Sequence, residues 1–232
     1  MVLHNAPIQA VIFDLDGTLL RTEHLQWKGW NVALRTLGVP LHLTKKQYQN
    51  YCGRSGHEIE KELLAEYGFS LPVGALLRAK ERFLHSHFNS EPLHWTKGAR
   101  FTLRYFRSLS IPVGLATGGK RDEMMKKLRK LDAHLHFDTL VCLSDVKNGK
   151  PSPDIYREAC RRLGVEPKHA LAFEDTQSGV LSASRAGLRV IAIPTPYSSK
   201  QDFSSAWAVC RDFKQAMKRI GNIEKNKPVK RH

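Results

Sequence analysis

The spacing of apolar residues changes repeatedly along the chain. Residues 9–15 form a short run rich in apolar and β-branched residues, which is typical of a buried strand. Between about 22 and 37, apolar residues including Trp30 and Leu34 recur at helical spacing, and Gly38 ends the pattern. The chain therefore opens with one strand followed by a helix.

The segments that follow fall into two parts. Helical patterns cover about 44–51, 57–67 and 75–88, and no strand signal occurs between about 22 and 95. Beyond 95 the two patterns alternate, with helices expected at 98–109, 120–130, 153–163, 177–186 and 212–220, and strands at 111–117, 139–143, 170–174, 189–193 and, weakly, 207–210.

This order predicts an α/β fold, a doubly wound parallel sheet with an all-helical segment inserted after the first strand. We assign 1–20 and 95–221 to the core, 21–94 to the helical insert, and 222–232 to a basic, disordered tail. An insert at this place would lie over the carboxyl ends of the strands, where open α/β sheets bind ligands.

Composition excludes several other classes. The 232 residues are 41% hydrophobic and 9% aromatic, enough for a core, so wholesale disorder is excluded. No apolar run approaches the roughly 20 residues that span a bilayer, and Met1–Ala10 does not resemble a signal peptide. The cysteines show no CxxC spacing, which argues against a zinc site or a disulfide framework and favours a cytoplasmic location. They are Cys52, Cys142, Cys160 and Cys210.

The net charge of +15 is concentrated in two segments. Residues 97–130 carry a net +8 and residues 214–232 a net +6. Arg100, Arg104 and Arg107 follow a helical stripe, as expected of a solvated helix face. Such charge could also bind nucleic acid, a partner that we disfavour but keep as an alternative from another functional class. The stretch 120–130 could also steer anionic substrates.

Two carboxylates end the first predicted strand. Asp14 and Asp16 flank one residue, and Gly17 allows the chain to turn there. Because close carboxylates repel one another, the pair indicates a cation between them, and oxygen ligands of this kind suit Mg²⁺.

Polar groups also follow three later strands. Thr117 precedes Gly118 and Gly119, whose N–H groups could hold an anion. Lys150 lies at a proline-rich helix start, and the pair Glu174-Asp175 ends another strand. Phosphoryl transfer needs acidic metal ligands, N–H donors that bind an anion, and a positive charge such as a lysine, and all three are expected at one sheet edge.

These motifs resemble those of the haloacid dehalogenase-like superfamily, in its phosphatase and phosphomutase branch with a helical cap. The four motifs appear in order as DLDGT at 14–18, Thr117 in ATGG, Lys150 in GKPSPD and Glu174-Asp175 in FEDTQSG. The segment 19–23, LLRTE, is similar to the common L-x-D-[ST]-E. The resemblance extends over nearly the whole chain to about residue 210.

The resemblance implies roles for single residues. Asp14 would attack phosphorus to form an aspartyl-phosphate, and Asp16 would act as general acid and base. Asp14, Asp175 and the backbone carbonyl of Asp16 would hold Mg²⁺, with Glu174 assisting through the water shell of the metal.

The resemblance also implies substrate contacts. Thr117 and the Gly118 N–H would bind phosphoryl oxygens, and Lys150 would neutralise charge between Asp14 and the phosphate. The insert would be the cap that excludes water and selects the substrate. Within it, Arg54 is the candidate for substrate binding, and Lys80 is a weaker one.

Departures from the family pattern bear on the reaction. Asp16 favours phosphate over haloacid substrates, since the dehalogenases lack a carboxylate at this position. Gln26 stands where phosphomutases carry a histidine, and Arg21 replaces the usual aspartate. We therefore expect a Mg²⁺-dependent phosphatase acting on a small phosphomonoester, such as a sugar phosphate or phosphoglycolate, with a β-phosphoglucomutase-like phosphohexomutase as the alternative. We expect no membrane partner, and a monomer or weak homodimer.

Overall fold

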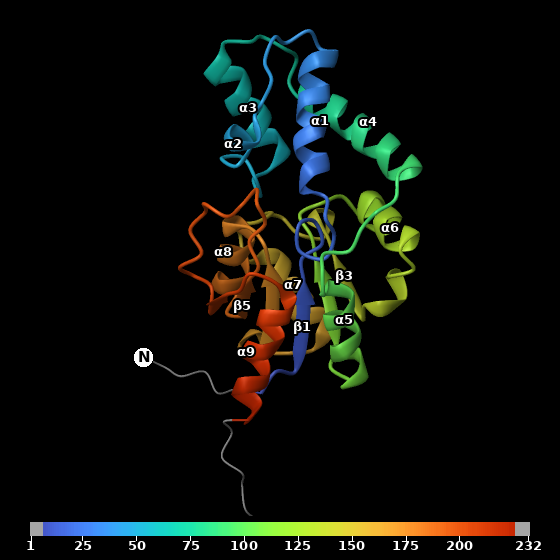
Figure 1. Ribbon diagram of the computed structural model, residues 1–232, viewed down its shortest axis with the longest axis vertical. Coiled ribbons are helices and arrows are strands. Elements are labelled where there is room, and N and C mark those ends of the chain that lie inside the picture. Colours follow the sequence, from blue (N-terminus) through green and yellow to red (C-terminus); the bar gives the residue numbers. More distant parts are fainter. Residues whose placement is uncertain (1–6, 226–232) are drawn as a thin grey trace, which may run out of the picture.

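The computed structural model describes residues 7–225 of the chain, and its core is a six-stranded sheet. The strands lie in the order β3-β2-β1-β4-β5-β6, and every neighbouring pair is parallel. Their bounds are β1 Ala10–Phe13, β2 Val113–Ala116, β3 Thr139–Val141, β4 Ala170–Glu174, β5 Arg189–Ala192 and β6 Ala208–Val209. The predicted α/β fold is confirmed (Figure 1).

Helices cover both faces of this sheet. On one face, α5 (Ala99–Ser108), α6 (Arg121–Lys130) and α9 (Phe213–Lys225) bury their apolar residues against Phe13 and Leu115. On the other face, α7 (Asp154–Leu163) and α8 (Gln177–Arg185) pack against residues such as Ile12. Short 3₁₀ turns occupy His134–His136, Leu143–Asp145 and Pro167–His169. Burial on both faces explains why the strands are nearly continuous apolar runs.

Four helices between β1 and α5 form the helical cap, above the carboxyl ends of the strands (Figure 1). They are α1 (Glu23–Thr36), α2 (Lys45–Tyr48), α3 (Gly56–Tyr67) and α4 (Ala75–Ser90). The cap has its own core around Trp30, Leu34 and Leu63. Its two connections to the sheet run side by side, since the Arg21 N–H donates to the His94 carbonyl at 3.0 Å.

The final helix is longer than the sequence pattern suggested. Helix α9 extends to Lys225, whereas the pattern predicted a helix over 212–220 and a tail from 222; residues 226–232 lie outside the described residues. The buried face of α9, which includes Phe213 and Ile220, anchors the helix, and each further residue then adds one backbone hydrogen bond.

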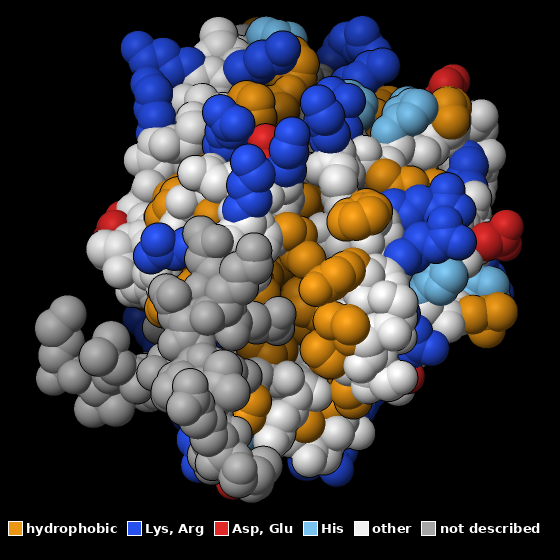
Figure 2. All heavy atoms as spheres, turned by 60° about the horizontal axis from the view of Figure 1, so that its bottom comes forward, with side chains coloured by type: hydrophobic (Ala, Val, Ile, Leu, Met, Phe, Trp, Pro, Cys, Tyr) orange, Lys and Arg blue, Asp and Glu red, His pale blue; other side chains and the backbone are white. Residues whose placement is uncertain are grey.

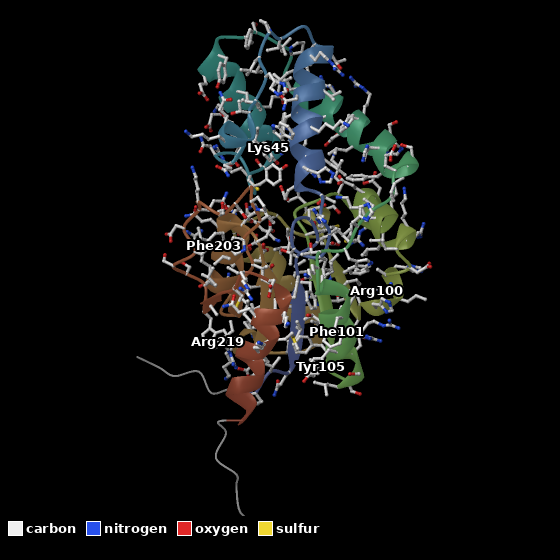
Figure 3. The ribbon with its side chains drawn as sticks, viewed as in Figure 1. Lys45, Arg100, Phe101, Tyr105, Phe203 and Arg219 are labelled. Atoms are coloured by element: carbon white, nitrogen blue, oxygen red, sulfur yellow. The ribbon has the colours of Figure 1, made fainter. Side chains whose placement is uncertain are left out.

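Basic side chains on α5 are exposed, as the helical stripe predicted. Arg100, Arg104 and Arg107 face solvent, and Arg107 pairs with Asp138 at 2.7 Å. Figure 3 shows Arg100, Phe101 and Tyr105 along α5, below the junction of cap and core. Figure 2 views the end of the core away from the cap, where apolar side chains gather next to Lys and Arg side chains. Within the described residues, no helix is long and apolar enough to span a membrane.

The position of α9 leads to a stability prediction. The Phe213 ring is fully buried and lies 5.3 Å from the Phe173 ring, centroid to centroid. We expect Phe213→Ala to lower the free energy of unfolding by about 3–5 kcal/mol because a large cavity remains. Phe101→Ala removes a ring that is 69% exposed and should cost less than about 0.5 kcal/mol. Urea denaturation measures both, and equal losses would contradict the placement of α9 in the core.

Candidate active site

The candidate site begins where β1 and β4 end side by side. Phe13 pairs with Phe173 in the parallel register, so Asp14 and the Glu174-Asp175 pair leave the sheet at the same point. All three carboxylates are buried, and one oxygen of each lies within 4.8 Å of the other two. The structure thus brings together residues that are about 160 positions apart in the sequence.

Lys150 neutralises part of this negative charge. Its ammonium donates to Asp14 Oδ1 at 2.6 Å, to Glu174 Oε1 at 2.5 Å and to the Ala116 carbonyl at 3.0 Å. The Tyr156 hydroxyl donates to the same Glu174 oxygen at 2.6 Å. Burial nevertheless raises the pKa of Asp14 to about 8, with Lys150 opposing the shift. One lysine does not balance three buried carboxylates.

The acidic cluster fits a divalent cation. Oδ2 of Asp175 is buried and has no hydrogen-bond partner in the part of the chain that the structure describes, although Thr18 donates to Oδ1 at 3.1 Å. Burial and the nearby carboxylates of Glu23 and Asp14 raise the pKa of Asp175 well above its usual range. A Cβ on Gly17 would lie 2.1 Å from Oδ2, so only glycine lets the chain pass this close to the oxygen. Clustered oxygens with unsatisfied charge are the donor set that Mg²⁺ takes.

Asp16 points away from this cluster. Its Oδ1 accepts from Thr22 Oγ1 at 2.7 Å and from Lys127 Nζ at 2.6 Å. Burial opposes ionisation, but Lys127 and the Thr22 hydrogen bond hold the pKa of Asp16 below its usual range. The two aspartates of one motif therefore occupy different electrostatic environments.

The loop after β2 lies beside Asp16. Thr117 is buried, its hydroxyl accepts from the Gly119 N–H at 3.1 Å, and a Cβ on Gly119 would approach Asp16 Oδ2 to 4.0 Å. A Cβ on Gly118 would meet no atom within 4 Å, so the backbone there faces open space. Five of the predicted site residues therefore converge on one sheet edge. They are Asp14, Asp16, Thr117, Lys150 and Asp175.

Arg54 lies further out. Its guanidinium pairs with Glu62 at 2.5 Å and lies 5.9 Å from the centroid of the Tyr51 ring. It lines a hollow of about 560 Å³ between cap and core, to which Lys150 also contributes. The structure thus places Arg54 near the site entrance, not on the carboxylate cluster.

The cap loop that precedes Arg54 rests on the core. A Cβ on Gly53 would lie 2.6 Å from Cβ of Thr176, so glycine permits this close approach. The side-chain amide of Gln201 donates to the Cys52 carbonyl at 2.9 Å, and the rings of Tyr48 and Tyr197 lie 5.9 Å apart. The described conformation is therefore one with the cap seated.

Glu23, at the start of α1, is a buried carboxylate to which the sequence analysis gave no role. It is 9% exposed, and its Oε2 accepts from the Cys52 thiol at 3.4 Å. Burial and the nearby charge of Asp16 raise the pKa of Glu23 to about 7. Lys80, the weaker substrate candidate, lies with its ammonium 4.8 Å from the centroid of the Trp30 ring.

Sequence reasoning also missed Lys127, which it counted among the basic residues of 97–130. The side chain is 1% exposed and pairs with Glu123 at 2.5 Å as well as with Asp16. Burial opposes its charge, but Asp16 and Glu123 outweigh burial and raise the pKa of Lys127. Its spacing from buried Met124 and Leu128 places it on the apolar face of α6, a signal that could have revealed it.

Other lysines at α6 contact the cap. Lys120 pairs with Glu81 at 2.7 Å, Lys126 lies 3.2 Å from Nε2 of His85, and Lys130 donates to the Phe88 carbonyl at 3.0 Å. Three of the lysines expected to steer substrates thus have partners in the cap, of which only Glu81 carries negative charge.

Comparisons with known proteins agree with this site. A family model described as haloacid dehalogenase-like hydrolase matches residues 11–193. Validoxylamine A 7'-phosphate phosphatase of Streptomyces hygroscopicus subsp. limoneus is 31% identical over 83% of this chain and 88% of its own. The phosphorylated carbohydrates phosphatase of Thermotoga maritima is 34% identical over 79% of this chain and 84% of its own length.

A similar structure is the crystal structure of CbbY from Rhodobacter sphaeroides in complex with phosphate. It superposes with a TM-score of 0.78 at 29% identity, over 89% of this chain and 95% of the other. The chain belongs to the haloacid dehalogenase-like hydrolase family. The prediction of a phosphoric monoester hydrolase is confirmed, because the family model describes hydrolases and several relatives are phosphatases.

The buried Glu23 predicts a pH-dependent stability. Its pKa in the folded state lies above the ordinary 4.5, so its contribution to stability is present below about pH 4.5 and is lost as the pH rises through about 7. We expect Glu23→Gln to raise the free energy of unfolding at pH 8 by on the order of 1–3 kcal/mol, and to change it little at pH 4.5. Urea denaturation in metal-free buffer measures this. Exposed Glu91→Gln is the control, and an equal gain at both pH values would contradict the prediction.

Proposed function

We propose that the protein is a Mg²⁺-dependent phosphatase that hydrolyses a small phosphomonoester through an aspartyl-phosphate on Asp14. The observation that carries the proposal is the pairing of Asp14 with Lys150 beside Glu174 and Asp175, while Asp16 is held separately by Lys127 and Thr22. A nucleophile, a candidate cation site and a separate acid/base are thus within one small volume.

In the first half-reaction, an Asp14 carboxylate oxygen attacks phosphorus and the ester oxygen leaves with the bond electrons. Lys150 opposes the rise in the pKa of Asp14 that burial causes, so it favours the ionised carboxylate, and it offsets negative charge on the phosphoryl group. Asp16 in its protonated form gives its proton to the leaving oxygen. Its position apart from the acidic cluster suits a group that exchanges protons rather than binding metal through its side chain.

In the second half-reaction, the Asp16 carboxylate takes a proton from water. The hydroxide oxygen that results attacks the phosphorus of the aspartyl-phosphate. The P–O bond to Asp14 breaks, and phosphate and the free carboxylate are restored. The Thr117 hydroxyl and the Gly118 N–H bind the other phosphoryl oxygens from the open side of the loop.

Asp14, Asp175 and the main-chain carbonyl of Asp16 would hold Mg²⁺, with Glu174 next to them. When bound, the ion neutralises charge on the phosphoryl oxygens and on the packed carboxylates. Their arrangement supports this assignment, because Oδ2 of Asp175 is buried beside Gly17 with no hydrogen-bond partner among the described residues.

Sugar phosphates or phosphoglycolate-like compounds are the substrate class that we propose. Relatives include a phosphatase of phosphorylated carbohydrates and one of validoxylamine A 7'-phosphate, and Arg54 lines the hollow that leads to Lys150. The cap, which we take as 21–94, would exclude water and select the substrate, with 1–20 and 95–221 as the core. The paired connections at Arg21 and His94 support these limits.

Replacing the nucleophile tests the mechanism. Asp14→Asn should lower kcat by at least roughly 10⁴-fold, because a neutral amide is a poor nucleophile, and should leave the protein folded. Phosphate release from a panel of sugar phosphates, measured without added bisphosphate, is the assay. Exposed Asp122→Asn is the matched control. Retained turnover in Asp14→Asn would contradict the mechanism, and turnover only with bisphosphate would favour a phosphohexomutase.

Metal binding can be tested without turnover. We expect Mg²⁺ at about 100 times its Kd to stabilise the protein by about 2.7 kcal/mol, seen as a higher Tm. Asp175→Asn removes one proposed ligand charge, so its Tm should be nearly independent of Mg²⁺. Asp202→Asn, an exposed aspartate, should keep the response. An unchanged response in Asp175→Asn would place the ion elsewhere.

A further inference from the structure

Of the lysines in the described part of the chain, only Lys127 is fully buried. Its ammonium makes three contacts with groups from three parts of the structure. Asp16 follows β1, Glu123 lies one turn earlier on α6, and the Phe88 ring belongs to cap helix α4, with its centroid 4.6 Å from Nζ. A buried ammonium is costly unless each donor is satisfied, so these contacts fix where the side chain lies.

The contact between Lys127 and Asp16 fixes where the Asp16 carboxylate lies. Oδ1 is held from two sides, by Lys127 at 2.6 Å and Thr22 at 2.7 Å. With Thr22 alone, the Asp16 carboxylate would accept one hydrogen bond from a neutral donor. The Lys127 ammonium adds a charge-assisted hydrogen bond of about twice the strength. Glu123 in turn pairs with the same ammonium at 2.5 Å.

The contact with Phe88 exists only because the cap rests on α6. The end of α4 lies next to α6 (Figure 1), and Lys130 donates to the carbonyl of Phe88 in the last turn of α4 and to that of Glu91, the residue after the helix. Phe88 is 1% exposed and covers Lys127. Excluding water strengthens the ion pair with Asp16, and the ring adds a cation–π attraction.

We propose that Lys127 is a positioning residue for Asp16, and that Phe88 makes this positioning depend on the seating of the cap. The proposal rests on the proposed function, since it assigns Lys127 to the acid/base residue of that reaction. With the cap seated, Lys127 is shielded and Asp16 is held next to Thr117 and Gly119. With the cap raised, water reaches the ammonium, competes for its donors and loosens the carboxylate.

Steady-state kinetics test the positioning role. Lys127→Met keeps the length and apolar stem but removes the ammonium, and should lower kcat by roughly 10²–10³-fold with KM changed by less than about threefold. Lys127→Arg restores the charge, and its kcat should be at least about tenfold higher than that of Lys127→Met. Lys126→Met, on the next residue, is the control and should stay near wild type. A kcat of Lys127→Met within about threefold of wild type would overturn the proposal, as would Lys127→Arg no better than Lys127→Met.

Chemical protection tests the role of the cap without any turnover. Acetylation by a water-soluble reagent, followed by peptide mass spectrometry, reports how far each lysine is accessible. Lys127 should react at least about tenfold faster in Phe88→Ala than in wild type. Phe83→Ala, on the same helix but facing Lys28, is the matched control. If Phe88→Ala melts below the assay temperature, Phe88→Leu replaces it, and its smaller side chain should still raise the rate at Lys127 at least about threefold. A rate equal to that of wild type in whichever of the two variants is folded would overturn the link to the cap.

The two assays separate this proposal from the proposed function. Turnover that disappears in Asp14→Asn but persists in Lys127→Met overturns the role of Lys127 and leaves the phosphatase intact. Wild-type protein that hydrolyses no phosphomonoester overturns the proposed function and the catalytic role of Lys127 together. The acetylation result then still decides whether Phe88 shields this lysine.

Discussion

Four carboxylates packed under one cap are the constraint on which the rest of the structure depends. Asp14, Glu174 and Asp175 meet because β1 and β4 are parallel neighbours, and Asp16 follows two residues later. Such a group repels itself unless cations lie among its members. Two lysines from distant parts of the chain supply this charge, Lys150 on one side and Lys127 on the other. The remaining unpaired oxygen on Asp175 marks where a further cation fits.

The two lysines also keep the aspartates of one motif chemically distinct. Lys150 shares its donors between Asp14 and Glu174, in a setting where burial still raises the pKa of Asp14. Lys127 acts on Asp16 together with Thr22, in a setting where the pKa of the carboxylate is lowered. Asp14 and Asp16, only two residues apart, therefore lie in different electrostatic environments, as their proposed roles of nucleophile and acid/base require.

The fold and the centre of the site could be predicted because they rest on local signals. Apolar period and turn residues located the strands and helices, and Asp14, Thr117, Lys150 and Asp175 each follow a strand. Lys127 and Glu23 could not be found in this way, since their burial depends on helices that meet only when the cap folds onto the core. In the sequence, Lys127 is one of several lysines on a charged helix. The end of α9 was missed because residues 222–225 are mostly polar, which is also typical of a tail.

The two edges of the cap are attached by different kinds of contact. At α6 the contacts are made by lysine ammonium groups, with Glu81 as an ion pair for Lys120 and backbone carbonyls as acceptors for Lys130. At residues 48–53 they are short-range and mostly uncharged, including Gly53 on Thr176 and Gln201 on the Cys52 carbonyl. Ionic strength weakens the first kind and leaves the second almost unchanged. We therefore expect salt to loosen the edge of the cap at α6 before the edge at residues 48–53.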